Sequence, residues 1–173
     1  MIFISGVHGV GKSYFCKLLQ KRIGVVSFSA STLIADKKHA AFFPDKKVAD
    51  IDKNQFYLLE AIRELRESEG EFLLDGHFCL LNKEGAITRV PLDTFTALAP
   101  DAIVLLTEDP SIIAHRRQER DGIQHSATDI KAFQDAEVTY AKEVAAKLNI
   151  PLKISAGSSD VHNTIEFIRT RRI

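Results

Sequence analysis

The sequence predicts an α/β fold of three layers, in which a five-stranded parallel sheet lies between two layers of helices. Short apolar runs rich in β-branched residues alternate along the chain with longer stretches of helical period, as in parallel sheets covered on both faces. Each run is predominantly apolar, which is typical of a strand buried on both sides. The expected strands cover residues 2–5, 25–28, 72–75, 102–107 and 151–155.

Five helices are expected between and after these strands, because apolar residues recur there at three- and four-residue steps. Gly24 and Gly70 supply stop signals for the first two helices. Asp109 and Pro110 suit the N-cap and the first helical position of the third. The expected helices cover residues 12–23, 52–69, 112–120, 129–148 and 160–171.

Two stretches have no clear period. Residues 39–47 and 76–91 carry Pro, Gly and mixed charge, which favours loops or a small hairpin. Loops beside strand ends often carry binding residues. Because 173 residues is the size of one ordinary domain, we expect a single domain over residues 1–173, with any second unit a small insertion.

The composition argues against several classes of protein. Lys and Arg together number 23, as do Asp and Glu, so the chain has no net charge to attract nucleic acid or an acidic membrane. Cys16 and Cys79 have no metal-type spacing, which predicts reduced packing thiols. The apolar opening of residues 1–4 is too short for a signal-peptide core or a membrane span. We therefore expect a cytoplasmic protein with no membrane partner, as a monomer or an oligomer.

Residues 6–13, Gly-Val-His-Gly-Val-Gly-Lys-Ser, fit the pattern G-x-x-x-x-G-K-[ST] of a phosphate-binding loop (P-loop). The loop is expected between a strand and a helix, where backbone N–H groups and the positive helix end surround a polyphosphate. Lys12 is predicted to bind the β- and γ-phosphates of ATP, and Ser13 to ligate Mg²⁺. The predicted nucleotide-binding residues are Gly6, His8, Gly9, Val10, Gly11, Lys12, Ser13 and Tyr14.

Asp75 ends the strand of residues 72–75, where proteins with this loop place the carboxylate that holds the hydration shell of Mg²⁺. Asp75 is thus predicted to share the metal with Ser13, although it could instead begin a turn before Gly76. His77 either orients a phosphate or a water molecule, or makes a structural hydrogen bond. His8 occupies a variable position of the loop pattern, so a solvent-facing residue is the alternative to a catalytic base.

With these motifs, the chain resembles the adenylate kinase-like nucleoside monophosphate kinases, in particular the archaeal-type adenylate kinases and their bacterial relatives. Residues 6–13 follow the first strand as they do in that family, and Asp75 and His77 are similar to the Asp-x-His at the end of its third strand. Residues 82–91 and 99–105 resemble the family's next loop and fourth strand. The blocks span most of the chain.

The resemblance implies an acceptor-binding arm between the second and third strands, about residues 30–70, and a short lid after the fourth, about residues 116–128. Arg116 and Arg120 are four residues apart, so they share one helix face and can meet the same nucleotide, and Arg117 is a third candidate. With the loop lysine, these arginines are the predicted catalytic residues, since an arginine delivered to the γ-phosphate is worth about 10³ to 10⁵ in rate. A solvated basic helix end is the alternative.

The sequence departs from the family where the acceptor phosphate should bind. Archaeal-type adenylate kinases carry an arginine near the start of the long arm helix, but residues 47–52 contain none. In the bacterial relatives an arginine follows the strand-three carboxylate, and Cys79 stands at its position. The remaining polar candidates for the acceptor are Lys46, Lys47 and His77. AMP is therefore expected to be a poor acceptor.

Three functions are consistent with these residues. The leading one is a kinase that moves the γ-phosphate of ATP to a nucleoside monophosphate or another small acceptor, and the lid arginines favour it. The missing acceptor arginines favour an ATPase or a nucleotide-dependent switch that acts on a protein partner, although no effector domain is evident. A kinase for RNA or DNA ends is disfavoured by the zero net charge.

Overall fold

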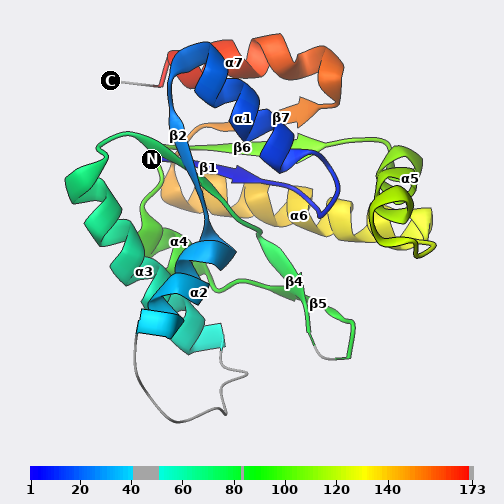
Figure 1. Ribbon diagram of the computed structural model, residues 1–173, viewed down its shortest axis with the longest axis horizontal. Coiled ribbons are helices and arrows are strands. Elements are labelled where there is room, and N and C mark those ends of the chain that lie inside the picture. The colour runs from blue at the N-terminus through cyan, green and yellow to red at the C-terminus, as the bar shows by residue number, and fades with distance from the viewer. Residues whose placement is uncertain (41–50, 83, 172–173) are drawn as a thin grey trace.

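The computed structural model describes residues 1–40, 51–82 and 84–171. Its central sheet has five parallel strands in the order β2-β3-β1-β6-β7 (Figure 1), which confirms the predicted fold class. Two strands are displaced by one residue from their predicted bounds, at positions 26–29 and 152–156. The strands are β1 (Ile2–Ser5), β2 (Val26–Ser29), β3 (Phe72–Asp75), β6 (Ala102–Thr107) and β7 (Leu152–Ala156).

The sheet is buried on both faces, because successive side chains of a strand point to opposite sides. In β1, Ile2 and Ile4 pack into one hydrophobic cluster with α1 and α7, whereas Phe3 packs into a second cluster with α3, α4 and α6. Figure 1 shows these helices on opposite sides of the strands. The helices are α1 (Lys12–Ile23), α3 (Ile51–Ser68), α4 (Leu92–Leu98), α6 (Ala127–Leu148) and α7 (Val161–Arg169).

The predicted helix boundaries agree with the structure at their capping residues. Gly24 ends α1 in the left-handed conformation with φ of 68°. Asp109 caps α5 (Pro110–Asp121), and its side chain accepts a hydrogen bond from the Ser111 N–H. The last helix, predicted over residues 160–171, runs only from Val161 to Arg169.

Two helices were not expected from the sequence. The first is α2 (Ala30–Ala40), so the loop predicted over residues 39–47 begins inside a helix, and residues 41–47 lie outside the described residues. The second is α4, whose Phe95 and Leu98 are fully buried. Both helices are short, and packing against the sheet and α3 stabilises them more than a repeating apolar pattern does.

Residues 76–91 contain the small hairpin that the sequence allowed, formed by β4 (Cys79–Leu81) and β5 (Ile87–Arg89). Tyr140 of α6 anchors the base of the hairpin, opposite its turn, by donating a hydrogen bond of 2.7 Å to the Val90 carbonyl. Cys16 and Cys79 are buried free thiols, as predicted. Within the described residues, no helix combines the length and apolar character needed to cross a membrane.

Candidate nucleotide-binding site

The phosphate-binding loop connects β1 to α1, which is the context that the sequence pattern required. At Gly6, with φ of 140°, a Cβ atom would lie 2.5 Å from the Leu106 carbonyl oxygen of β6. At Gly9, with φ of 82°, it would lie 3.0 Å from the Arg117 Cγ atom. Side chains at either position would therefore force the loop away from its neighbours. The glycines let the loop curl closely against the sheet and α5.

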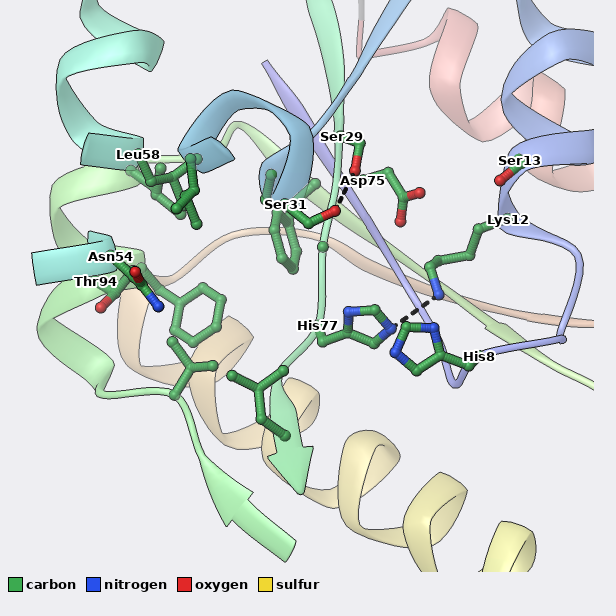
Figure 2. A pocket seen from close by; sticks show the side chains of 18 of the residues that line it. His8, Lys12, Ser13, Ser29, Ser31, Asn54, Leu58, Asp75, His77 and Thr94 are labelled. Atoms are coloured by element: carbon green, nitrogen blue, oxygen red, sulfur yellow. Dashed lines mark hydrogen bonds between the residues drawn. The ribbon is translucent and has the colours of Figure 1, made fainter. Parts of the chain in front are cut away.

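Lys12 lies at the centre of the site, with only 8% of its surface exposed. Its ammonium donates to the Gly6 carbonyl oxygen at 2.5 Å and to the Nε2 atom of His77 at 3.1 Å (Figure 2). Burial lowers the pKa of Lys12, and the negative charge of Asp75 opposes that shift. A polyphosphate would replace these weak partners with charged oxygen atoms, so the lysine is well placed for a phosphate ligand.

His77 faces the phosphate-binding loop from the segment after β3. Burial and the charge of Lys12 lower the pKa of His77 to about 3, so its imidazole is neutral and accepts the lysine hydrogen bond. The His8 ring lies beside it, with ring centroids 4.4 Å apart. The structure thus brings the rings of His8 and His77 together beside the Lys12 ammonium. His8 is an exposed loop residue, and it lines the same cavity as His77 and Lys12.

The Asp75 carboxylate ends β3 on the side of the site opposite Ser13 (Figure 2). Its Oδ1 atom is buried and has no hydrogen-bond partner among the described residues, and burial raises the pKa of Asp75 against the opposing effect of Lys12. An unpaired buried carboxylate oxygen suits a cation or its water shell. Within the described ranges, no group of three or more His, Cys, Asp and Glu residues is placed to hold a metal ion.

A cavity of about 580 Å³ extends from Lys12 along the carboxyl ends of β1, β2 and β3 toward α2, α3 and α4. Lys12, Ser13 and Arg120 line its phosphate end, and Tyr14, which is 73% exposed, lies at its border. Figure 2 shows Asn54 and Thr94 at the opposite end, far across the cavity from Lys12. The cavity therefore has room for a second small molecule beside a nucleotide's phosphates.

Two of the predicted lid arginines hold the phosphate-binding loop by its backbone. Arg116 donates to the Val10 carbonyl at 3.3 Å and pairs with Glu108 at 3.2 Å. Arg117 donates to the His8 carbonyl at 2.8 Å. Because both side chains come from α5, they fix the loop against the helix that follows β6.

Arg120 is the predicted lid arginine that lines the main cavity. It donates two hydrogen bonds, of 2.6 and 2.7 Å, to the Asp121 carboxylate. This ion pair is typical of the alternative role, an arginine at a solvated basic helix end. Arg116 instead borders a separate cavity of about 330 Å³, together with Val10, Tyr14 and Gly157. The arginines four residues apart thus meet different cavities.

Glu137 of α6 is a site residue that sequence reasoning missed. Its buried carboxylate accepts hydrogen bonds from the Ser5 hydroxyl at 2.7 Å and from the N–H groups of Phe78 and Cys79 at 2.8 and 2.7 Å. Burial raises the pKa of Glu137, and these hydrogen bonds oppose the rise. The carboxylate ties the end of β1 to the segment that carries His77. An acid one helical turn before Tyr140, on an apolar helix face, was the signal that could have revealed it.

The predicted acceptor residues are only partly described. Lys46 and Lys47 lie outside the described residues, as does most of the stretch of residues 47–52 that lacks the family's arm arginine. Cys79 is fully buried, with its N–H bonded to Glu137, and it does not line the main cavity. His77 does line that cavity.

Two archaeal proteins have sequences similar to that of this chain. An adenylate kinase of Pyrococcus horikoshii is 25% identical over 168 residues, which cover 87% of this chain and 84% of that protein. A putative adenylate kinase of Methanocaldococcus jannaschii is 30% identical over 120 residues, or 69% of this chain and 58% of that protein. These similarities confirm the resemblance to archaeal-type adenylate kinases.

A solved structure shares the fold, and a family profile matches most of the chain. A crystal structure of a gluconokinase from Sinorhizobium meliloti 1021 has a TM-score of 0.53 and 16% identity, covering 99% of this chain and 97% of that one, so it shares the fold. Residues 5–134 match the sequence profile of the AAA domain family, and they include the phosphate-binding loop, Asp75 and the three arginines of α5. The chain belongs to the AAA domain family of P-loop proteins.

Proposed function

We propose that the chain is an ATP-dependent phosphotransferase that moves the γ-phosphate of ATP to a nucleoside monophosphate or another small acceptor. One observation carries the proposal: a single cavity extends from Lys12 and Asp75 to a region between α2, α3 and α4 that both polar and apolar side chains line. Phosphoryl transfer needs mainly positioned positive charge and an acceptor held beside it, and this cavity offers the charge of Lys12 and room for an acceptor. The similarity to adenylate kinases supports the same reaction class.

The donor nucleotide is expected to lie across the phosphate-binding loop. Its phosphates would meet Lys12 and the backbone N–H groups of the loop, and Mg²⁺ would be held by Ser13 and, through water, by Asp75. The cation would neutralise charge on the β- and γ-phosphates. The cavity of about 330 Å³ next to Tyr14 and Arg116 suits the base, because it opens directly beside the loop. In the single domain that we propose, residues of the acceptor-binding arm line the main cavity, and residues of the lid line both cavities.

An acceptor screen tests the proposal. The protein is incubated with Mg²⁺ and ATP labelled at the γ-phosphate, in the presence of nucleoside monophosphates and of other small hydroxyl compounds. Label in a small-molecule product supports phosphotransfer. Release of inorganic phosphate alone would favour the second candidate, an ATPase or switch acting on a protein partner. That candidate draws support from the exposed Leu81, Ile87 and Ile123 side chains near the hairpin and the lid.

Replacing Asp75 with asparagine is expected to impair the use of Mg²⁺-ATP more than the binding of ATP without metal. The variant keeps the shape of the side chain but removes the charge that would hold the metal's water shell. We expect the KM for Mg²⁺-ATP to rise about 10-fold or more, while the Kd for ATP in EDTA changes about twofold. Calorimetry with and without Mg²⁺ makes the comparison. Equal losses in both conditions would show that Asp75 has a structural role.

AMP is expected to bind at least about 10-fold more weakly than ATP, a gap of about 1.4 kcal/mol or more. A nucleotide phosphate is normally clamped by bidentate arginine hydrogen bonds, and the buried Cys79 cannot supply them. Titration calorimetry with each nucleotide and a coupled assay of ADP formation measure the difference. Micromolar AMP affinity with rapid ADP formation would contradict it and indicate ordinary adenylate kinase activity.

A further inference from the structure

We propose that the acceptor is an uncharged small molecule with hydroxyl groups, rather than a phosphorylated nucleotide. This inference rests on the proposed phosphotransfer and names the class of its acceptor. It is carried by the acceptor end of the main cavity, where the polar side chains among the described lining residues are all uncharged. These side chains are Ser29, Ser31, Asn54, Gln55 and Thr94.

The oxygens of two side-chain amides at this end of the cavity lack hydrogen-bond partners among the described residues. These are the buried Asn54 Oδ1 and Gln55 Oε1 atoms, at the start of α3. Leaving such a buried group unpaired is unfavourable, so a ligand that pairs with it gains affinity. A hydroxyl group both donates and accepts, and it therefore matches an amide in either orientation. A phosphate dianion has no proton to donate to an amide oxygen.

The rest of the acceptor end combines hydroxyl groups with apolar walls. Ser29 and Ser31 are hydrogen-bonded to each other at 2.9 Å, and Figure 2 shows them between Asp75 and the Asn54 end of the cavity. Thr94 is 5% exposed, and Leu58 forms part of the wall of the same cavity. Alternating polar and apolar contacts suit the carbon skeleton and hydroxyl groups of a sugar, a polyol or a nucleoside.

The distribution of charge also disfavours a second phosphate. Among the described residues that line the cavity, the cationic side chains are Lys12 and Arg120, both at the end where the donor phosphates would bind. The charged side chain between them and the acceptor end is the Asp75 carboxylate (Figure 2). An anionic acceptor would approach that carboxylate with no arginine of the described lining residues at the acceptor end to neutralise it. An uncharged acceptor avoids this repulsion.

The reaction that follows is a simple displacement at phosphorus. The hydroxyl oxygen of the acceptor forms a bond to the γ-phosphorus of ATP, and the bond from that phosphorus to the β,γ-bridging oxygen breaks. ADP leaves with the electron pair of the broken bond, and the hydroxyl proton is released to solvent. The products are a phosphate monoester, ADP and a proton, so atoms and charge balance.

Three sets of acceptors, each incubated with γ-labelled ATP and Mg²⁺, test the inference: the nucleosides adenosine and cytidine, the neutral compounds ribose, glucose and glycerol, and the monophosphates AMP and CMP. We expect a labelled phosphate monoester in the first or second set, and the two sets distinguish nucleosides from sugars and polyols. Labelled product from the monophosphates alone would overturn the inference but leave the proposed phosphotransfer standing. Labelled inorganic phosphate with no labelled ester in any set would overturn both.

Variants at the two amides then test the site. With the neutral acceptor that is phosphorylated, Asn54→Ala and Gln55→Ala are each expected to raise the acceptor KM about 3- to 10-fold, the effect of one lost hydrogen bond, and to change the KM for ATP much less. Gln20→Ala, on the exposed face of α1, is the matched control. Thermal denaturation shows whether each variant folds. Folded Asn54 and Gln55 variants with the acceptor KM of the control would overturn the assignment.

Discussion

Replacing Lys12 with alanine is expected to lower kcat at least about 100-fold, since positioned charge on the transferring phosphate is the main catalytic requirement of this reaction. The ammonium is directed into the cavity between the loop carbonyl of Gly6 and the His77 ring, and a polyphosphate would take over both contacts. No other cationic side chain among the described residues lies at the centre of the phosphate end, because Arg120 is paired with Asp121 at the border.

The fold of the Lys12→Ala variant is expected to survive. Burial lowers the pKa of Lys12, so the folded protein holds this ammonium at some energetic disadvantage, and removing it relieves that penalty. Steady-state kinetics, circular dichroism and thermal denaturation are measured together. Lys17→Ala is the control, because Lys17 is an exposed lysine of the same helix. Near-normal turnover in a folded Lys12→Ala protein would refute the phosphate-loop mechanism.

Replacing Glu137 with alanine is expected to lower the free energy of unfolding by about 3–5 kcal/mol. The change removes the acceptor of three buried hydrogen bonds and leaves the Ser5 hydroxyl and two backbone N–H groups without a partner. For a domain of this size, the loss corresponds to a Tm lower by about 10 °C. We also expect kcat to fall, because the segment that carries His77 loses its anchor.

Glu137→Gln is the matched variant for this test. Glutamine has the same shape, its carbonyl can still accept from the backbone N–H groups, and its amide can donate to the Ser5 oxygen. We expect a loss of about 1 kcal/mol, well below that of the alanine variant. Urea denaturation of both variants gives the comparison. If the two variants lost equal stability, the carboxylate's negative charge rather than its hydrogen bonds would be the stabilising feature.

The strands and the phosphate-binding loop could be predicted because their determinants are local. A continuous apolar run produces a buried strand, and glycines with positive φ are needed wherever the loop turns sharply. The Asp75 position followed from the same reasoning, since it ends a predicted strand. Helices α2 and α4 could not be predicted in this way, because short segments without a repeating apolar pattern become helical only when they pack against the rest of the protein.

The sequence by itself thus determined the fold class, the position of the phosphate-binding loop between β1 and α1, and the place of Asp75 at the end of β3. Only the tertiary structure decided that Glu137 fastens the His77 segment to the end of β1, and that Asn54 and Thr94 face one cavity from different helices. The reason is physical: capping, turns and strand burial depend on neighbours in sequence. The cavity between α2, α3 and α4 instead depends on side chains that lie far apart along the chain and meet only when helices pack on a sheet.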